Sequence, residues 1–226
     1  MKEATLFDKG EKSGSGKNVE STLQYKKQSY WENRFQCEEQ YEWLCNYSDV
    51  KEYICRDVRF DDKILVLGCG NSTFSADLYD AGFKNVTSVD FSTIVIDSMK
   101  KKYQYSHPSL KWIVSDVRNL EEIEDATFDL VIDKACLDAL VCDEGDPWRP
   151  NEETTKDVQA TLCSVVRVLN HQSNAKFISI GFQQPHFRKL YLISDNTTYG
   201  WEDNVKTFPI NVGLGYFYTR CICVGK

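Results

Sequence analysis

Short apolar runs alternate with segments of helical spacing along most of the chain. Five runs without a helical period are predicted as strands, over residues 64–67, 85–90, 110–114, 128–132 and 175–181. Segments with helical spacing or helix-end signals are predicted as helices, over residues 71–81, 92–105 and 152–169. Strands that alternate with helices in this way are typical of a doubly wound, parallel sheet.

Two final segments alternate apolar and polar positions, over residues 201–208 and 216–224. Because Pro209, Gly213 and Gly215 separate them, they are predicted as an antiparallel pair. The expected fold is therefore α/β, a doubly wound, seven-stranded and mostly parallel sheet with an antiparallel C-terminal strand pair.

Composition divides the chain ahead of the first strand. Residues 1–20 carry glycine, serine and balanced charges with almost nothing to bury, and we expect a flexible tail there. The next stretch is rich in aromatic side chains, which predicts a helical cap over residues 21–60 in front of a sheet core over residues 61–226. At 226 residues, a single domain over residues 21–226 is expected.

The overall composition narrows the classes of function. A net charge of −7 argues against a nucleic-acid substrate, because phosphate binding needs a positive face, and favours a basic or lysine-bearing partner. Nine cysteines without paired spacing predict reduced thiols in an intracellular, cytoplasmic protein. The three histidines are scattered, so no metal site is expected. No run reaches the ~20 apolar residues of a membrane span, and the first residues lack the apolar core of a signal peptide. A monomer is the simplest expectation.

Glycines and charged residues stand where four of the predicted strands end. They are Gly68 and Gly70 after the first strand, Asp90 at the end of the second, Asp116 after the third, and Asp133 and Lys134 after the fourth. Parallel strands bring these ends to one rim, where such sheets bind nucleotide-like ligands. Asp90 follows Gly70 by 20 residues, the spacing of an acid that accepts ribose hydroxyls. The third glycine position of the dinucleotide fingerprint holds Thr73, so the turn by itself is weak evidence.

The order of these strand ends resembles that of class I S-adenosylmethionine-dependent methyltransferases. Shorter motifs are similar to a methyltransferase-like branch that acts on a lysine of translation elongation factor 1-alpha, at residues 30–35, 68–72, 85–90, 137–140, 146–148 and 185–188. Val66 stands where many class I enzymes carry an acid, and Ser72 where they often carry a third glycine, but the branch shares both features. The similarity runs from about residue 30 to the C-terminus.

The resemblance implies S-adenosylmethionine as cofactor, S-adenosylhomocysteine as product, and particular cofactor contacts. These contacts are Trp31, Phe35 and Trp43 along the pocket, the backbone of Gly68 and Gly70, Asp90 at the ribose, Phe91, Asp116 and Val117 around the adenine, Lys134 at the rim, and Arg34 at the methionine carboxylate. From the residues alone, two alternatives stay open. Trp31 and Trp43 could be aromatic residues of the core, and Arg34 could be an exposed charge on a helix.

The resemblance also implies methyl transfer to a lysine amine of a protein. Asp133, Asp138 and His186 are candidate catalytic residues near the acceptor, with Trp148 and Phe187 beside them, although each has a structural alternative. We expect the loop over residues 143–150 to shape the groove for the protein substrate. A small-molecule methyltransferase and a non-catalytic cofactor-binding module are the alternatives, and an NAD-dependent dehydrogenase is disfavoured by Thr73 and by the terminal strand pair.

Overall fold

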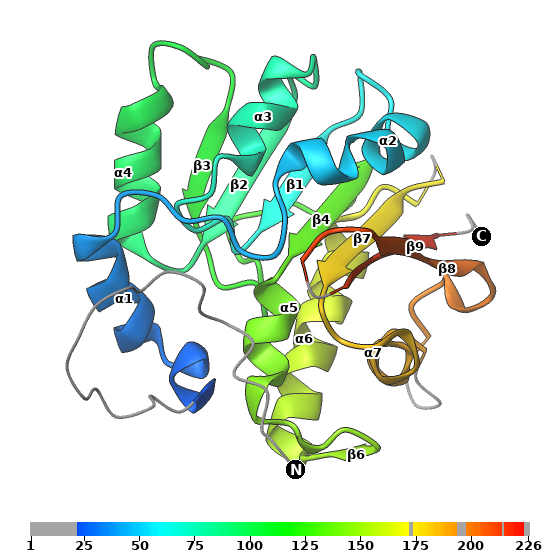
Figure 1. The fold of residues 1–226 in the computed structure, drawn as a ribbon. Helices are drawn as coiled ribbons and strands as arrows, with labels where there is room; N and C mark the ends of the chain where they lie inside the picture. Colours follow the sequence, from blue (N-terminus) through cyan, green and yellow to red (C-terminus); the bar gives the residue numbers. More distant parts are fainter. Residues whose placement is uncertain (1–21, 172–173, 194–197, 214, 224–226) are drawn as a thin grey trace.

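The computed structural model describes residues 22–171, 174–193, 198–213 and 215–223. A sheet of seven strands runs through it in the order β3 (Lys111–Val114), β2 (Val86–Asp90), β1 (Ile64–Leu67), β4 (Leu130–Lys134), β7 (Lys176–Gly181), β9 (Tyr216–Ile222) and β8 (Val205–Ile210) (Figure 1). The first five strands are parallel, whereas β9 is antiparallel to both β7 and β8. The predicted fold class is confirmed.

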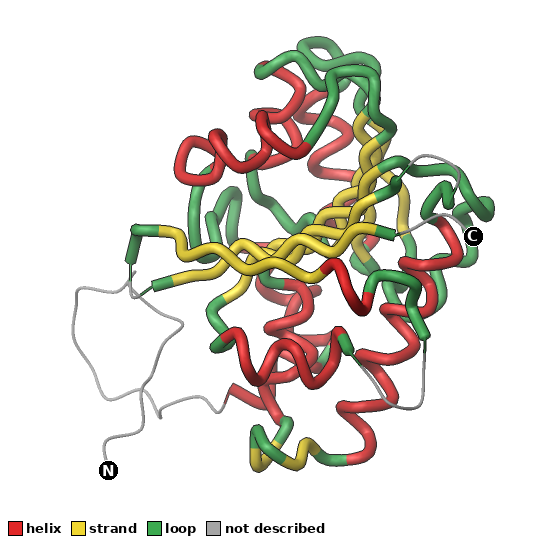
Figure 2. Tube along the Cα trace, turned by 90° about the vertical axis from the view of Figure 1, so that its right-hand side faces the viewer, coloured by secondary structure: helices red, strands yellow, loops and turns green. Residues whose placement is uncertain are grey.

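The apolar runs form central strands because both of their faces are covered. All four residues of β1 are buried, and successive side chains enter opposite layers of the core. Ile64 and Val66 pack in the layer with α2 (Tyr47–Asp57), α3 (Phe74–Asp80) and α4 (Thr93–Tyr103). Leu65 and Leu67 pack in the layer with α5 (Cys136–Leu140), α6 (Glu152–Val168) and α7 (Pro185–Leu192). Figure 2 shows the helices on both sides of the sheet.

The remaining elements lie around these layers. They are η1 (Thr22–Lys26) and α1 (Gln28–Cys37) before the sheet, η2 (Val141–Asp143) after α5, a small hairpin of β5 (Gly145–Asp146) and β6 (Arg149–Pro150), and η3 (Glu202–Asn204) before β8. Among the described residues, no helix has the length and apolar composition that crossing a bilayer requires. The predicted tail over residues 1–20 lies outside the described residues.

Several predicted boundaries differ from the structure. Strand β4 begins two residues later than predicted, because the backbone of Phe128 bonds to Val168 and Asn170 instead of to β1. Helix α3 begins at Phe74 and not at residue 71, since the residues between form a turn. The predicted loop over residues 143–150 contains the β5–β6 hairpin, and the short helix α5 was not predicted. Pro209 lies inside β8, where an edge strand tolerates the missing N–H.

Candidate active site

A single pocket gathers most of the predicted cofactor residues at the carboxyl ends of β1 to β4. Ten of the eleven line it, namely Trp31, Phe35, Trp43, Gly68, Gly70, Asp90, Phe91, Asp116, Val117 and Lys134. The predicted residues come from four strand ends and from the chain ahead of the sheet, so the fold brings them together over long sequence separations. Arg34 is the exception and does not line the pocket.

The glycine turn after β1 needs its glycines for two different reasons. Gly68 and Gly70 both have φ of +51°, a left-handed conformation that side chains with a Cβ adopt at a cost. A Cβ on Gly68 would lie 2.6 Å from Sγ of Cys136, at the start of α5. A Cβ on Gly70 would meet Phe35 at 3.6 Å, which is ordinary contact. The turn therefore presents bare backbone to the pocket.

Asp90 connects this turn to the end of β2. Its carboxylate accepts hydrogen bonds from the backbone N–H of Gly70 at 3.0 Å and of Ser92 at 2.9 Å. Burial raises the pKa of Asp90 to about 6, although these two N–H donors act in the opposite direction. A carboxylate has about four acceptor positions, so about two stay available for a ligand.

Glu42, in the loop between α1 and α2, bonds to the residues that follow the glycine turn. Glu42 accepts hydrogen bonds from the backbone N–H of Thr73 at 2.5 Å and from the hydroxyl of Ser72 at 2.7 Å. The Lys134 ammonium donates to Glu42 at 3.3 Å and to the carbonyl of Trp43 at 3.0 Å. Sequence reasoning missed Glu42, because nothing near it in the chain marks a partner 31 residues away.

Aromatic rings form one wall of the pocket. Trp31 stacks on Phe35 with ring centroids 5.7 Å apart, and its indole N–H donates to the carbonyl of Tyr25 at 2.7 Å. Tyr25 and Tyr41 also line the pocket, and neither was predicted. Arg34 lies behind this wall, with both Nε and Nη2 at 2.8 Å from the carboxylate of Glu38.

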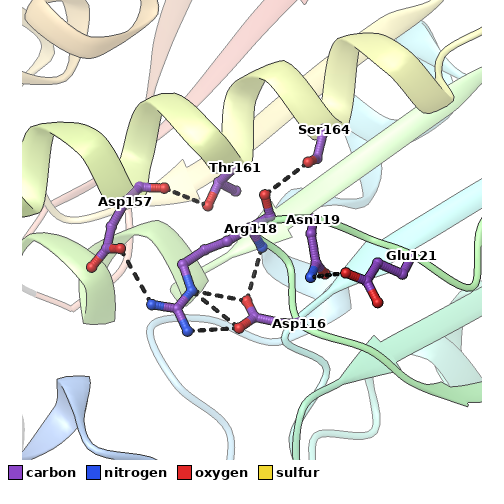
Figure 3. Close-up of polar contacts among 7 residues, drawn as sticks. All are labelled: Asp116, Arg118, Asn119, Glu121, Asp157, Thr161 and Ser164. Atoms are coloured by element: carbon purple, nitrogen blue, oxygen red, sulfur yellow. Dashed lines mark hydrogen bonds and ion pairs between the residues drawn. The ribbon is translucent and has the colours of Figure 1, made fainter.

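An ion-pair network of Asp116, Arg118 and Asp157 also lines the pocket (Figure 3). Asp116 accepts hydrogen bonds from the guanidinium of Arg118, which also reaches Asp157 of α6 at 3.2 Å. Burial acts to raise the pKa of Asp116, but the hydrogen bonds from Arg118 outweigh it, and the pKa is lowered. Arg118 and Asp157 line the pocket and were not predicted.

The predicted catalytic residues do not line this pocket. Asp133 is fully buried and accepts hydrogen bonds from the hydroxyl of Ser179 at 2.7 Å and the backbone of Leu137 at 3.0 Å. Asp138 is also fully buried and pairs with Arg188. Both carboxylates thus join β4 and α5 to neighbouring elements within the core.

The third of these residues, His186, lies on the surface. Its ring stacks on the exposed ring of Trp148 with centroids 5.4 Å apart, so Trp148 and His186 do come together as the motif residues suggested. Phe187 packs against both rings, at 4.9 Å from Trp148 and 4.0 Å from His186. This aromatic cluster is separate from the pocket lining.

Comparison with known proteins identifies the same type of domain. Residues 64–146 match the model of a methyltransferase domain. The chain is 38% identical to mouse EEF1A lysine methyltransferase 4 over 75% of this chain and 66% of that protein. It is 37% identical to the Bos taurus protein of that name, over 80% and 70%. Mouse eEF1A lysine and N-terminal methyltransferase is 34% identical over 75% of this chain, which spans 23% of that longer protein.

Solved structures share the fold at low sequence identity. The N-methyltransferase NodS of Bradyrhizobium japonicum, in complex with S-adenosyl-L-homocysteine, has a TM-score of 0.56 at 13% identity, covering 90% of this chain and 99% of that chain. Magnesium protoporphyrin IX methyltransferase of Synechocystis, with S-adenosylmethionine bound, has a TM-score of 0.55 at 13% identity, covering 92% and 100%. From the pocket and these relatives together, the chain belongs to the class I S-adenosylmethionine-dependent methyltransferases, in the family that includes the EEF1A lysine methyltransferases.

Proposed function

We propose that this protein transfers methyl groups from S-adenosylmethionine to a lysine side chain of translation elongation factor 1-alpha. The observation that carries the proposal is the single pocket in which ten predicted cofactor contacts meet. The substrate is taken from the names of relatives that are 37–38% identical to this chain.

The polar groups of the pocket fit the parts of this cofactor. We assign the two available acceptor positions of Asp90 to the ribose hydroxyls, and the carboxylate of Asp116 to the adenine amino group. The bare backbone at Gly68 and Gly70 allows the close approach that a bound nucleoside needs.

The methionine carboxylate is assigned to Lys134. Of its three N–H donors, two serve Glu42 and Trp43 within the described part of the chain, which leaves one for the carboxylate. Arg34, which the sequence suggested for this carboxylate, is less suited, because its guanidinium is held by Glu38 and does not line the pocket.

The bound cofactor supplies a methyl group on a positively charged sulfur, which a neutral amine can displace in line. The chain's own residues contribute mainly by orienting the two reactants, which can supply a large part of the acceleration. The rings of Trp31 and Trp43 exclude water from one side of the pocket. A lysine that enters such a site loses hydration, which lowers its pKa and favours the neutral, nucleophilic form.

The proposal also covers the localisation, the oligomeric state and the type of partner of the protein. We propose a cytoplasmic monomer that binds a protein and not a nucleic acid, because the net charge of −7 suits a basic segment around the acceptor lysine.

The direct test is methylation of purified elongation factor 1-alpha in the presence of S-adenosylmethionine, followed by peptide mass spectrometry. We expect added methyl groups on one lysine with the wild-type chain, and far fewer at the same limiting cofactor concentration with Asp90→Asn, which weakens a proposed cofactor contact. The target would be wrong if the wild-type chain bound S-adenosylhomocysteine but left every lysine of the factor unmodified. Turnover on small metabolites with no protein labelling would instead identify a small-molecule methyltransferase.

A further inference from the structure

Arg118 connects two sides of the pocket through a planar fork of hydrogen bonds (Figure 3). Its Nε lies 3.1 Å from both carboxylate oxygens of Asp116, and its Nη2 lies 2.7 Å from Oδ2. Its backbone N–H donates to Oδ1 of the same carboxylate at 2.9 Å. The remaining nitrogen, Nη1, reaches Asp157 of α6 at 3.2 Å. One residue therefore ties the loop after β3 to the helix across from it.

Helix α6 also fixes the backbone from which this fork extends. The hydroxyl of Ser164, a buried residue of α6, donates to the carbonyl oxygen of Arg118 at 2.9 Å. Thr161 bonds within the helix to the carbonyl of Asp157 at 2.9 Å. Arg118 is thus held at its backbone and at its guanidinium, so it can hold Asp116 in one orientation.

The hydrogen bonds from Arg118 leave part of the acceptor capacity of the Asp116 carboxylate for a ligand. A carboxylate offers about four acceptor positions, and Arg118 fills three of them with its backbone N–H, Nε and Nη2. About one acceptor position is left on a carboxylate that lines the pocket. That position accepts one N–H from a ligand and repels a ligand oxygen.

We propose that Arg118 determines base specificity by holding Asp116 as a fixed, ionised acceptor, so that the pocket selects adenine over hypoxanthine. Adenine carries an amino group at the six-position, and hypoxanthine carries a carbonyl oxygen there. The inference rests on the proposed function, because it assumes that the adenine end of the cofactor meets Asp116.

The charge of Asp116 follows from the same contacts. The hydrogen bonds from Arg118 lower the pKa of Asp116 against the effect of burial. Without Arg118 the carboxyl group can rotate, so its oxygens are no longer held in one direction.

The test compares the dissociation constants of S-adenosylhomocysteine and its inosine analogue by isothermal titration calorimetry at pH 7. For the wild-type chain, we expect the inosine analogue to bind about tenfold more weakly or worse, the factor that one hydrogen bond to a charged group carries. In Arg118→Gln this ratio should fall at least about threefold, whereas general loosening of the site would weaken both ligands alike and keep the ratio. In Asp116→Asn the ratio should fall to about one or below, because an amide presents a donor as well as an acceptor.

Arg59→Gln is the matched control. Arg59 forms the same fork with Asp61, two residues later, with Nε at 3.0 Å and Nη2 at 2.7 Å, but neither residue lines the pocket. This variant should keep the wild-type ratio. An unchanged ratio in Arg118→Gln overturns the inference alone, whereas an unchanged ratio in Asp116→Asn overturns it together with the assignment of Asp116 to the adenine amino group. If the wild-type chain binds neither nucleoside, the proposed function and the inference fail together.

Discussion

The ionisation of Asp90 should control how tightly the cofactor binds. Burial raises the pKa of this carboxyl group to about 6, and the ionised form is the one that accepts the ribose hydroxyls. With that pKa, about 90% of the free chain is ionised at Asp90 at pH 7 and about 10% at pH 5. If the ligand binds the ionised form, the affinity for S-adenosylhomocysteine falls about tenfold between these two pH values.

The same pKa makes an opposite prediction for folding stability. Because the folded state binds the Asp90 proton more tightly than the unfolded state does, this group stabilises the fold at low pH. Its contribution is lost as the pH rises from about 4, the ordinary value, to about 6. Cofactor affinity should therefore rise over part of the range in which the contribution of Asp90 to stability declines.

The assay is calorimetric titration with S-adenosylhomocysteine in half-unit steps from pH 5 to pH 7, below the ordinary pKa of an α-amino group. Asp90→Asn is the control, because an amide does not titrate. It also loses one of the two acceptor oxygens that hold Gly70 and Ser92, so its affinity at pH 7 should be at least tenfold lower, about the effect of one charged hydrogen bond. A flat wild-type profile, or an equal slope in Asp90→Asn, would refute the reasoning.

Three further predictions concern other parts of the molecule. Gly68→Ala should lower the melting temperature and the cofactor affinity more than Gly70→Ala. Both introduce left-handed strain of about 1–2 kcal/mol, but the first also clashes with α5; equal losses in thermal unfolding would contradict this. Asp138→Asn should cost about 3–5 kcal/mol in urea unfolding, because it removes the carboxylate that pairs with the buried Arg188 cation; a stable but inactive variant would instead support the predicted catalytic role. Trp148→Ala should change the free energy of unfolding by less than about 0.5 kcal/mol, since the ring is exposed, but it should slow protein methylation. An unchanged methylation rate would show that Trp148 in the β5–β6 hairpin does not take part in substrate binding.

The sheet and most of the residues that line the pocket could be predicted because their signals are local in the sequence. A buried parallel strand is a short apolar run, and the residue that ends it, such as Asp90, stands at the rim wherever the strand lies in the sheet. Gly68 and Gly70 are marked in the same local way, by the turn that they make possible.

The contacts that the sequence did not reveal depend on partners far along the chain. Asp138 is buried and pairs with Arg188, which lies 50 residues later, and nothing near Asp138 indicates this contact. Arg118 meets Asp157 across 39 residues for the same reason. Helix α5, with five residues, is too short for a periodic pattern to be recognised.

Because Ser72 and Thr73 donate hydrogen bonds to Glu42, the sheet core alone does not contain all the groups that hold the glycine turn. A fragment that starts at residue 61 retains every strand of the sheet, yet it lacks Glu42, which holds the residues after the glycine turn. Exchanging domains with a relative would consequently succeed only when the leading helices and the turn are transplanted as one unit.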